Sequence, residues 1–236
     1  MELSKRLRAI VELVKEGDLP ADIGCDHGYV SICLIKERRC SSVIAMDINQ
    51  GPLYHANENV KREGLNPYIE TRLSDGATAL EEGEADTLIC AGMGGRLVIH
   101  IVEEAINRLS GIKTLILQPQ SEIWLVRRFL LQHCFFIVKE NMVLEEGKYY
   151  PMMRAEKREK AGYMTYTKAE ELYGPLLLKE KHPVLLQYLQ KEKETVSRTI
   201  ERLTLEKKEG NLSGRQERKK ELLEKLQCIE ECISGF

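Results

Sequence analysis

The sequence contains no long uninterrupted apolar run. Its first segment, residues 1–18, mixes apolar side chains with charged ones throughout, which is not the pattern of a signal peptide or of a membrane span. The spacing instead predicts an amphipathic helix, whose apolar face is formed by Leu3, Leu7, Ile10, Val11 and Val14. We therefore expect a cytoplasmic protein that has no membrane partner.

The seven cysteines form no metal-binding or disulfide pattern. None belongs to a C-x-x-C pair, and none has a histidine partner at the spacing that zinc sites use. We expect reduced and mostly buried thiols in a reducing compartment, and no bound metal.

The chain also has little net charge, −2 over 236 residues at pH 7. This argues against a protein that coats nucleic acid indiscriminately, although a local basic face is compatible with it. The length is sufficient for one large domain, or for one domain with an appendage.

The sequence does contain a regular alternation of apolar runs and helical patterns. Strands are predicted to end at Ile23 and to cover residues 42–47, 68–73, 86–90 and 114–117, with helices over residues 29–36, 52–64, 97–109 and 123–132. A closing antiparallel hairpin is predicted over residues 135–139, 142–144 and 149–153. This order is typical of an α/β protein with a largely parallel, doubly wound sheet that has helices on both faces.

Unusual residues follow the carboxyl ends of the predicted parallel strands. Asp26, Asp47, Asp75 and the loop at residues 92–95 all stand at such an end. Ligands of sheets of this kind bind outside the carboxyl ends of the strands, where the strand order reverses. We therefore expect these residues to line one crevice.

The first strand end is the run ADIGCDHGY, residues 21–29, which predicts a strand, a tight turn and a helix N-terminus. Gly24 and Gly28 permit a sharp turn and the close approach of a ligand, and the free amides of the first helical turn favour a polar or anionic group. A glycine turn alone also suits any α/β protein. Together with the other strand ends, it predicts a cradle for a nucleoside cofactor.

The acidic residues distinguish between cofactors. Dinucleotide folds use G-x-G-x-x-G, whereas Asp26 here replaces the second glycine; it would repel a pyrophosphate but accept hydrogen bonds from an ammonium group. Asp47 is placed to accept both hydroxyls of a ribose, and Asp75 to accept the exocyclic amine of an adenine. These features favour S-adenosylmethionine over NAD, which stays open as an alternative.

Beyond residue 160 the pattern changes to heptads. Leu189, Val196 and Leu203 recur every seven residues, and Ile200 adds to the same face. After residues 210–214 a second series follows, formed by Leu222, Leu226, Ile229 and Ile233. These spacings predict an antiparallel, coiled-coil-like helical hairpin that turns at residues 210–214. The charged run 215–220 fits either a solvated face or a nucleic-acid contact.

The motifs over residues 21–151 resemble those of class I methyltransferases. More narrowly, the combination of ADIGCDHGY, AGMGG (91–95), LQPQ (117–120) and a helical tail is similar to the bacterial tRNA adenine-22 N1-methyltransferase family over essentially the whole chain. The resemblance implies S-adenosylmethionine-dependent methylation of adenine N1 in the D-arm region of tRNA. It also implies a seven-stranded Rossmann-like catalytic domain, residues 1–158, and a helical tRNA-binding domain, residues 159–236. We expect a monomer.

Three groups of site residues follow from the spacing and the resemblance. The cofactor-binding residues are expected to be Asp22, Gly24, Asp26, Gly28, Asp47, Ile48, Ser74, Asp75, Gly76, Ala91, Gly92, Met93 and Gly94. The residues expected to orient the target adenine are Asp26, His27, Tyr29 and Gln118, although His27 also suits a plain helix start. The residues expected to contact tRNA are Lys5, Arg6, Arg8, Arg215, Arg218, Lys219 and Lys220. These basic groups have no interleaved aromatics, which favours contacts to the RNA backbone.

Methylation at N1 needs no covalent catalyst, because a flipped adenine presents its own lone pair. Cys90 lies within a predicted strand and is expected in the core, unlike the nucleophile of carbon-5 pyrimidine methylation. The Asn/Asp-Pro-Pro-aromatic run of amino-nitrogen methyltransferases is absent from residues 91–94. Two alternatives stay open: a methyltransferase of another RNA or of a small molecule, and a non-catalytic adaptor that binds partners through its helical hairpin.

Overall fold

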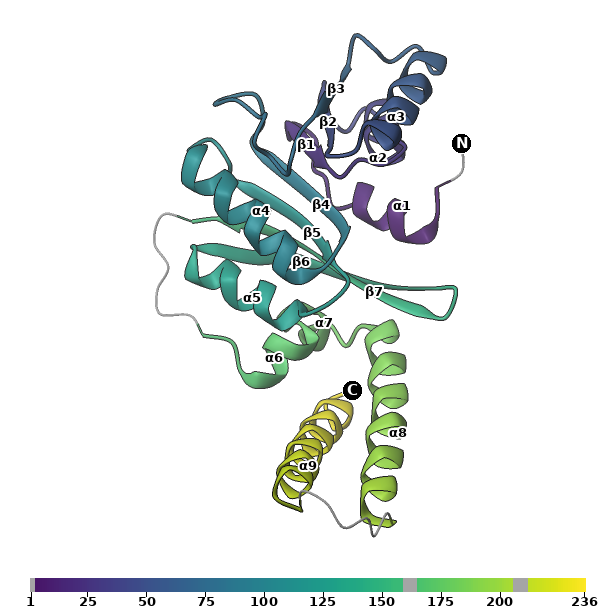
Figure 1. Cartoon of the computed structure of the whole chain (residues 1–236), viewed down its shortest axis with the longest axis vertical. Coiled ribbons are helices and arrows are strands. Elements are labelled where there is room, and N and C mark those ends of the chain that lie inside the picture. Colours follow the sequence, from purple (N-terminus) through teal and green to yellow (C-terminus); the bar gives the residue numbers. More distant parts are fainter. Residues whose placement is uncertain (1–2, 159–164, 206–211) are drawn as a thin grey trace. The chain divides into compact units, whose positions relative to one another are not determined.

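The computed structural model describes residues 3–158, 165–205 and 212–236 (Figure 1). The chain divides into two compact units, Met1–Thr165 and Tyr166–Phe236. The domain boundary predicted between residues 158 and 159 stands beside residues 159–164, which lie outside the described residues.

The first unit alternates strands and helices in the predicted order. Its strands are β1 (Pro20–Ile23), β2 (Val43–Asp47), β3 (Ile69–Leu73), β4 (Thr87–Met93), β5 (Thr114–Pro119), β6 (Phe135–Glu145) and β7 (Lys148–Lys157). Its helices are α1 (Lys5–Val11), α2 (Tyr29–Lys36), α3 (Gln50–Arg62), α4 (Gly95–Arg108) and α5 (Ile123–Gln132).

These strands form one seven-stranded sheet in the order β3-β2-β1-β4-β5-β7-β6. Strands β1 to β5 pair in parallel, whereas β7 pairs antiparallel with both β5 and β6. The strand order reverses between β1 and β4, so the carboxyl ends of these two strands flank the place where a ligand is expected. The predicted doubly wound sheet and its closing hairpin are confirmed.

Helices cover both faces of the sheet. In Figure 1, α1, α2 and α3 lie on one side of the strands, and α4 and α5 lie on the other. The apolar core on the first side joins these helices to the strands through buried residues that include Ile10, Ile32, Val60, Ile89 and Ile116. Within the described residues, no helix is long and apolar enough to cross a membrane.

The first helix is shorter than the predicted amphipathic segment, because α1 ends at Val11. The carbonyl of Leu13 accepts a hydrogen bond from Arg154 at 3.1 Å, and the carbonyl of Val14 accepts one from Arg39 at 3.1 Å. These guanidinium groups satisfy backbone acceptors that a longer helix would have paired internally. The chain can therefore turn toward β1 while Leu13 and Val14 stay buried.

Strand β4 is longer than predicted and continues to Met93. Its register with β5 shifts between Ala91 and Met93, and Gly92 between them has a φ of +80°. This is the geometry of a β-bulge, in which a glycine accepts the left-handed conformation without strain. The bulge re-aims the end of β4, and the predicted loop at residues 92–95 is partly strand and partly the start of α4.

The second unit is helical within its described residues. It contains α6 (Lys168–Tyr173), α7 (Pro175–Lys179), α8 (Pro183–Leu205) and α9 (Leu212–Ser234). Two contacts show that helices α8 and α9 pack antiparallel. Lys193, in the first half of α8, pairs with Glu230 near the end of α9 at 2.8 Å, and Arg215, near the start of α9, donates to the carbonyl of Leu203 near the end of α8 at 2.7 Å. The predicted helical hairpin is confirmed.

The heptad positions of the hairpin form its interface. Leu189, Val196, Leu222 and Ile229 are buried between the helices or against their neighbours. Of the predicted turn at residues 210–214, positions 210 and 211 lie outside the described residues, and positions 212–214 already belong to α9. The second helix therefore begins earlier than the glycine pattern predicts.

Candidate active site

Three residues with positive φ shape the turn between β1 and α2. The values are +71° at Gly24, +52° at Asp26 and +72° at Gly28. The amides of Gly24 and Cys25 both donate to the carbonyl of Met46, at 2.8 and 2.9 Å, which ties the turn to β2. Aspartate is one of the few residues other than glycine that adopts this conformation at a modest cost. The turn therefore holds a carboxylate where a dinucleotide fold has a glycine.

Both glycines have a positive φ, which other residues rarely adopt, and other elements approach them closely. A side chain at Gly24 would overlap the terminal methyl group of Met93. A Cβ at Gly28 would lie 3.3 Å from the Cβ of Ala56 on α3. The turn is thus open to the close approach of a ligand on the side of Met93, whose flexible side chain can move, and is closed by α3 on the other.

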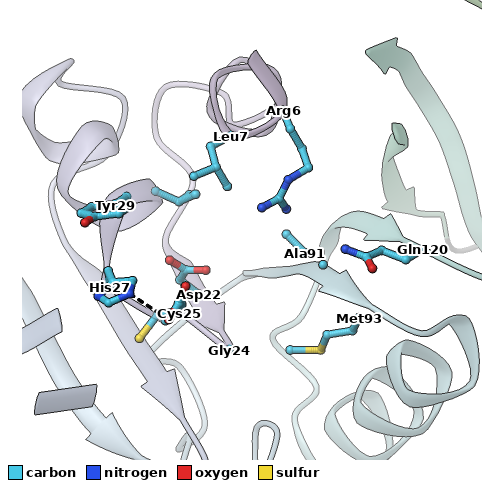
Figure 2. Close-up of a pocket in the computed structure, with 13 residues that line it drawn as sticks. Arg6, Leu7, Asp22, Gly24, Cys25, His27, Tyr29, Ala91, Met93 and Gln120 are labelled. Carbon is cyan, nitrogen blue, oxygen red and sulfur yellow. Dashed lines mark ion pairs between the residues drawn. The ribbon is translucent and has the colours of Figure 1, made fainter. Parts of the chain in front are cut away.

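A cavity of about 320 Å³ opens at the carboxyl ends of β1 and β4. Figure 2 shows that Arg6 and Leu7 enter it from α1, that His27 and Tyr29 lie together on the side of α2, and that Gln120 lies beyond β5. Its lining residues are Arg6, Leu7, Asp22, Gly24, Cys25, Asp26, His27, Tyr29, Val30, Ala91, Gly92, Met93 and Gln120.

Asp22 forms a buried acidic part of the cavity wall. It is only 4% exposed, and its carboxylate accepts a hydrogen bond from the hydroxyl of Ser31 at 2.7 Å. Burial raises the pKa of Asp22 to about 6, although the Ser31 bond opposes the shift. The group is therefore mostly ionised at neutral pH and would be stabilised by a cation in the cavity.

Asp47 is held at the end of β2 by backbone amides. One carboxylate oxygen accepts from the amide of Asn49 at 2.8 Å, and the other accepts from the amide of Asp26 at 3.3 Å. Each carboxylate oxygen has a second lone pair, so both can still accept a hydroxyl hydrogen. The acid is preoriented next to the turn, as a ribose-binding residue requires.

The predicted adenine contact lies beside Asp47. The amide of Ser74 donates to the carbonyl of Asp47 at 3.0 Å, and the Ser74 hydroxyl donates to the carbonyl of Gly76 at 2.9 Å. Ser74 thereby shapes the turn, whereas the side chain of Asp75 is exposed. Ile48, next to Asp47, leaves 59% of its surface exposed. A carboxylate and an apolar side chain are thus presented near the ribose-binding acid.

Arg6 brings a cation into the cavity. Its guanidinium donates to Oε1 of Gln118 at 3.1 Å, and its Cζ lies 5.6 Å from the centre of the Tyr150 ring. No carboxylate pairs with it among the described residues. Gln118 itself is buried and does not line the cavity, so it contacts Arg6 in place of a ligand.

The predicted base-orienting residues His27 and Tyr29 stack on each other, with ring centroids 5.4 Å apart and planes inclined by 22°. Nε2 of His27 lies 3.5 Å from the carboxylate of Asp26, and the dashed line in Figure 2 marks this contact. The His27 carbonyl accepts from the side-chain amide of Asn59 at 2.9 Å. The backbone of His27 is therefore fixed by α3, while its ring faces the cavity.

The buried thiols do not serve as nucleophiles. Cys90 is fully buried in β4, and burial raises its pKa to about 12. Burial and the neighbouring carboxylates Asp22, Asp47 and Asp26 also raise the pKa of Cys25. Because the thiolate is the reactive form, both cysteines are inert at neutral pH.

The residues predicted to contact tRNA differ in their exposure and in whether they already form an ion pair with a carboxylate. Arg8 forms an ion pair with Glu37, and Arg218 pairs with Glu221 at 2.9 Å. The side chains of Lys5 and Lys220 are exposed. The arginines Arg6, Arg8 and Arg215 are only partly exposed, as is Lys219.

Several cavity residues were not predicted as such. Leu7, Cys25, Val30 and Gln120 were not assigned to the site, and Arg6 was assigned to tRNA. Gln120 belongs to the LQPQ run that ends a strand, so its position at the carboxyl end could have indicated it. Arg6 had no local signal, because its place depends on how α1 packs against distant segments.

A family model and a relative that covers almost the whole chain identify the same family. The sequence pattern of tRNA (adenine(22)-N(1))-methyltransferases matches residues 20–231. A Bacillus subtilis tRNA (adenine(22)-N(1))-methyltransferase is 33% identical over 235 residues, which cover 99% of this chain and 98% of that protein.

Solved structures give the same result. The B. subtilis m1A22 tRNA methyltransferase superposes with a TM-score of 0.86 at 32% identity, over 98% of this chain and 99% of that one. A Streptococcus pneumoniae protein, described as a candidate for the same activity and solved in complex with S-adenosyl-L-methionine, superposes with a TM-score of 0.85 at 34% identity. That match covers 98% of this chain and 100% of the other.

Proposed function

The chain belongs to the tRNA (adenine(22)-N(1))-methyltransferase family, and on that premise we propose how its residues perform the reaction. It is an S-adenosylmethionine-dependent enzyme that methylates N1 of adenine 22 in tRNA. The observation that carries the assignment of roles is the cavity between β1 and β4, which presents the carboxylates of Asp22 and Asp26 and the guanidinium of Arg6. The methionine end of the cofactor has an ammonium, a sulfonium and a carboxylate group, so its charges complement this wall.

We assign the nucleoside end of the cofactor to the next two strand ends. The Asp47 carboxylate, already oriented by two backbone amides, accepts the ribose hydroxyls. Asp75 accepts the exocyclic amine of the adenine, and the exposed side chain of Ile48 covers a face of the ring. Ser74 and Gly76 support this contact by holding the turn.

We assign the methionine end to the cavity itself. Asp26 accepts from the ammonium group, and the buried charge of Asp22 favours a cation nearby. Arg6 binds the carboxylate, because a guanidinium held by a neutral amide and an aromatic ring keeps donors for an anion. Gln118 is then a positioning residue for Arg6. The glycines of the turn, and the backbone of residues 91–94, give the ligand room to approach.

The chain orients the target base and does not need to activate it. S-adenosylmethionine supplies an electrophilic methyl group, and N1 of an unpaired adenine supplies the lone pair. His27 and Tyr29 offer ring faces on the cavity wall on which the adenine can stack, and Asp26 can accept from its amine. The contribution of these side chains is the alignment of the adenine with the methyl group.

Basic side chains supply the sequence-independent part of tRNA binding. We propose that Lys5 and Arg8 near the cavity, and Arg215, Arg218, Lys219 and Lys220 on α9, contact phosphates. The exposed lysines contribute most, because the charges of Arg8 and Arg218 are shared with Glu37 and Glu221.

We propose a cytoplasmic location for this enzyme. All seven cysteines are free thiols in the structure, and exposed or half-buried thiols persist in a reducing compartment. That the protein is a monomer stays a prediction.

The full-length protein is to be incubated with methyl-labelled S-adenosylmethionine and an unmodified tRNA transcript that has adenine at position 22. A transcript with guanine at position 22 is the matched control. We expect label in N1-methyladenosine from the first transcript and none from the second. Cofactor binding without transfer to any tRNA would send the search to other acceptors. Absence of cofactor binding would favour the alternative that the protein is a non-catalytic adaptor.

A further inference from the structure

Four aromatic rings form a continuous row that begins at the cavity and runs outward. His27 stacks on Tyr29, and the centre of the His27 ring lies 5.5 Å from that of His55 on α3, with planes inclined by 40°. The His55 ring in turn lies 5.8 Å from the Tyr54 ring, which meets it edge-on at 70°. We call these residues, Tyr29, His27, His55 and Tyr54, the aromatic row.

One end of the row belongs to the cavity and the other does not. His27 and Tyr29 line the cavity, whereas Tyr54 and His55 lie outside it. Tyr54 leaves 62% of its surface exposed, which makes it one of the most exposed large hydrophobic side chains of the described residues, and His55 is also exposed. The adenine site accounts for the inner two rings only. The outer two rings do not line the cavity, and we assign them to neither the cofactor nor the target base.

The row is held by the fold, because α3 is fastened to the turn that carries His27. The side-chain amide of Asn59 donates to the carbonyl of His27 at 2.9 Å, and Ala56 packs against Gly28. The rings therefore keep their spacing without a ligand. Among the described residues, no hydrogen bond engages the hydroxyl of Tyr54 or the ring nitrogens of His55, so these polar atoms are available to a partner.

A cation stands on the same helix. Arg62 is exposed, and its guanidinium donates to Oδ1 of Asn59 at 2.7 Å without an ion pair to any carboxylate of the described residues. Ring faces combined with an unpaired guanidinium match the two parts of a nucleotide, its base and its phosphate.

From this geometry we propose that Tyr54 and His55 bind an unpaired nucleobase that adjoins adenine 22 in the tRNA. The proposal rests on the proposed function, because the inner end of the row receives the target adenine. When that adenine leaves its stack, its neighbour loses a stacking partner, and the outer rings replace it. Arg62 binds a phosphate of the same strand.

The test removes the outer rings in the full-length enzyme. We expect Tyr54→Ala combined with His55→Ala to weaken tRNA binding about ten- to hundredfold, since stacking on one aromatic side chain contributes that much per base. Binding of S-adenosylhomocysteine should not change. The single variant Tyr54→Phe should keep most of the parental tRNA affinity, because it keeps the ring. The single variant Tyr54→Leu, which is apolar but has no ring, should lose affinity. Tyr68→Ala is the matched control, because Tyr68 is 51% exposed but lies outside the row.

A fluorescence signal distinguishes stacking from a structural effect. The fluorescent base 2-aminopurine is placed in turn on each side of adenine 22. We expect the 2-aminopurine fluorescence of one of the two transcripts to be quenched when it binds to the parent or to Tyr54→Phe. Tyr54→Ala should quench the fluorescence of neither transcript. Thermal unfolding at the parental temperature would confirm that each variant is folded.

Parental tRNA affinity of the double variant, or equal quenching by Tyr54→Ala and the parent, would overturn the proposal. Loss of S-adenosylhomocysteine affinity would also overturn it, because the outer rings would then belong to the cofactor site. Failure of the proposed function is a separate result: the parent itself would not methylate the transcript.

Discussion

The two units of this protein place their charges differently. In the first unit Arg127 and Glu140 form an ion pair at 3.1 Å with side chains 1% and 0% exposed, and Arg154 binds Asp18 with side chains 4% and 12% exposed. In the second unit Lys193 and Glu230 pair with side chains 43% and 50% exposed. The first unit has a fully buried ion pair in its core, whereas the ion pairs of the helical hairpin stay in contact with water, including that of Lys225 and Glu192, whose side chains are 39% and 15% exposed.

This difference separates two uses of charge. A buried pair is costly to desolvate and very costly to break, so it specifies one arrangement of the strands and helices around it. A solvated pair contributes little to stability, and its members can exchange partners with a phosphate backbone. We therefore expect the first unit to respond to charge removal through stability and cofactor affinity, and the hairpin through tRNA affinity.

The largest effect is expected from breaking the buried pair. Glu140→Gln leaves the guanidinium of Arg127 in the core without its carboxylate, which should lower the free energy of unfolding by about 3–5 kcal/mol. Glu230→Gln is the matched control on the hairpin and should cost about 1 kcal/mol or less. Chemical denaturation of both variants measures the two values. Equal losses would contradict the comparison.

Asp22 should connect stability to pH. Its folded-state pKa, about 6, is above the ordinary value of 3.8, so the folded protein holds this proton more tightly than the unfolded chain does. Ionisation therefore opposes folding increasingly as pH rises from about 4 through 6, by up to about 3 kcal/mol. Asp22→Asn should raise the melting temperature at pH 7.5 but not at pH 4.

The same substitution should weaken cofactor binding. In the parent, affinity for S-adenosylmethionine should fall as pH drops through 6, because Asp22 loses the charge that favours a cation. In Asp22→Asn this dependence should be absent. Calorimetric titrations at pH 5 and pH 7.5 test both statements, and a pH dependence that persists in the variant would assign it to another group.

Arg6 and Arg8 give a smaller and more local comparison. Arg6→Gln should weaken S-adenosylhomocysteine binding about ten- to hundredfold, because a charge-assisted hydrogen bond to the carboxylate is lost. Binding of 5′-methylthioadenosine, which lacks the amino-acid end, should not change. Arg8→Gln, two positions away and paired with Glu37, is the control and should leave both affinities intact. If Arg6→Gln bound S-adenosylhomocysteine with parental affinity, Arg6 would not bind the cofactor and would again be a predicted tRNA contact.

The smallest effect is expected on α9. Lys219→Gln combined with Lys220→Gln should weaken tRNA binding several-fold at moderate salt. The slope of log affinity against log salt concentration should also become shallower, by about one for each phosphate contact that is lost. Cofactor affinity and the melting temperature should stay at the parental values. Unchanged tRNA affinity would make the charged run a solvated face, which is the alternative that the sequence left open.

Much of the fold could be predicted because its signals are local. The apolar strands, the glycine turn at residues 24–28 and the heptads of the hairpin each depend on neighbouring residues, and the structure has all of them. The bounds that failed are those set by distant partners. The first helix stops at Val11 since Arg154 and Arg39 satisfy the carbonyls that follow it.

The candidate site shows the same division. Asp26, Asp47 and Asp75 were predicted to line one crevice because the strand ends of a parallel sheet converge by topology. Of these three acids, Asp26 lines the cavity, whereas Asp47 and Asp75 are not among its lining residues. The row formed by His27 and His55 could not be predicted, because it depends on the approach of α3 to a turn that lies in another part of the sequence.

The sequence by itself determined which residues stand at the strand ends, and thus the cofactor class and the parallel sheet, because periodicity and turn chemistry act over a few residues. Only the tertiary structure decided that Arg6 faces the cavity and Gln118 supports it. Those two residues are 112 positions apart, and their contact exists only after α1 has packed beside the completed sheet. The buried pair of Arg127 and Glu140 was likewise decided by packing, since nothing in its local sequence separates it from an exposed pair.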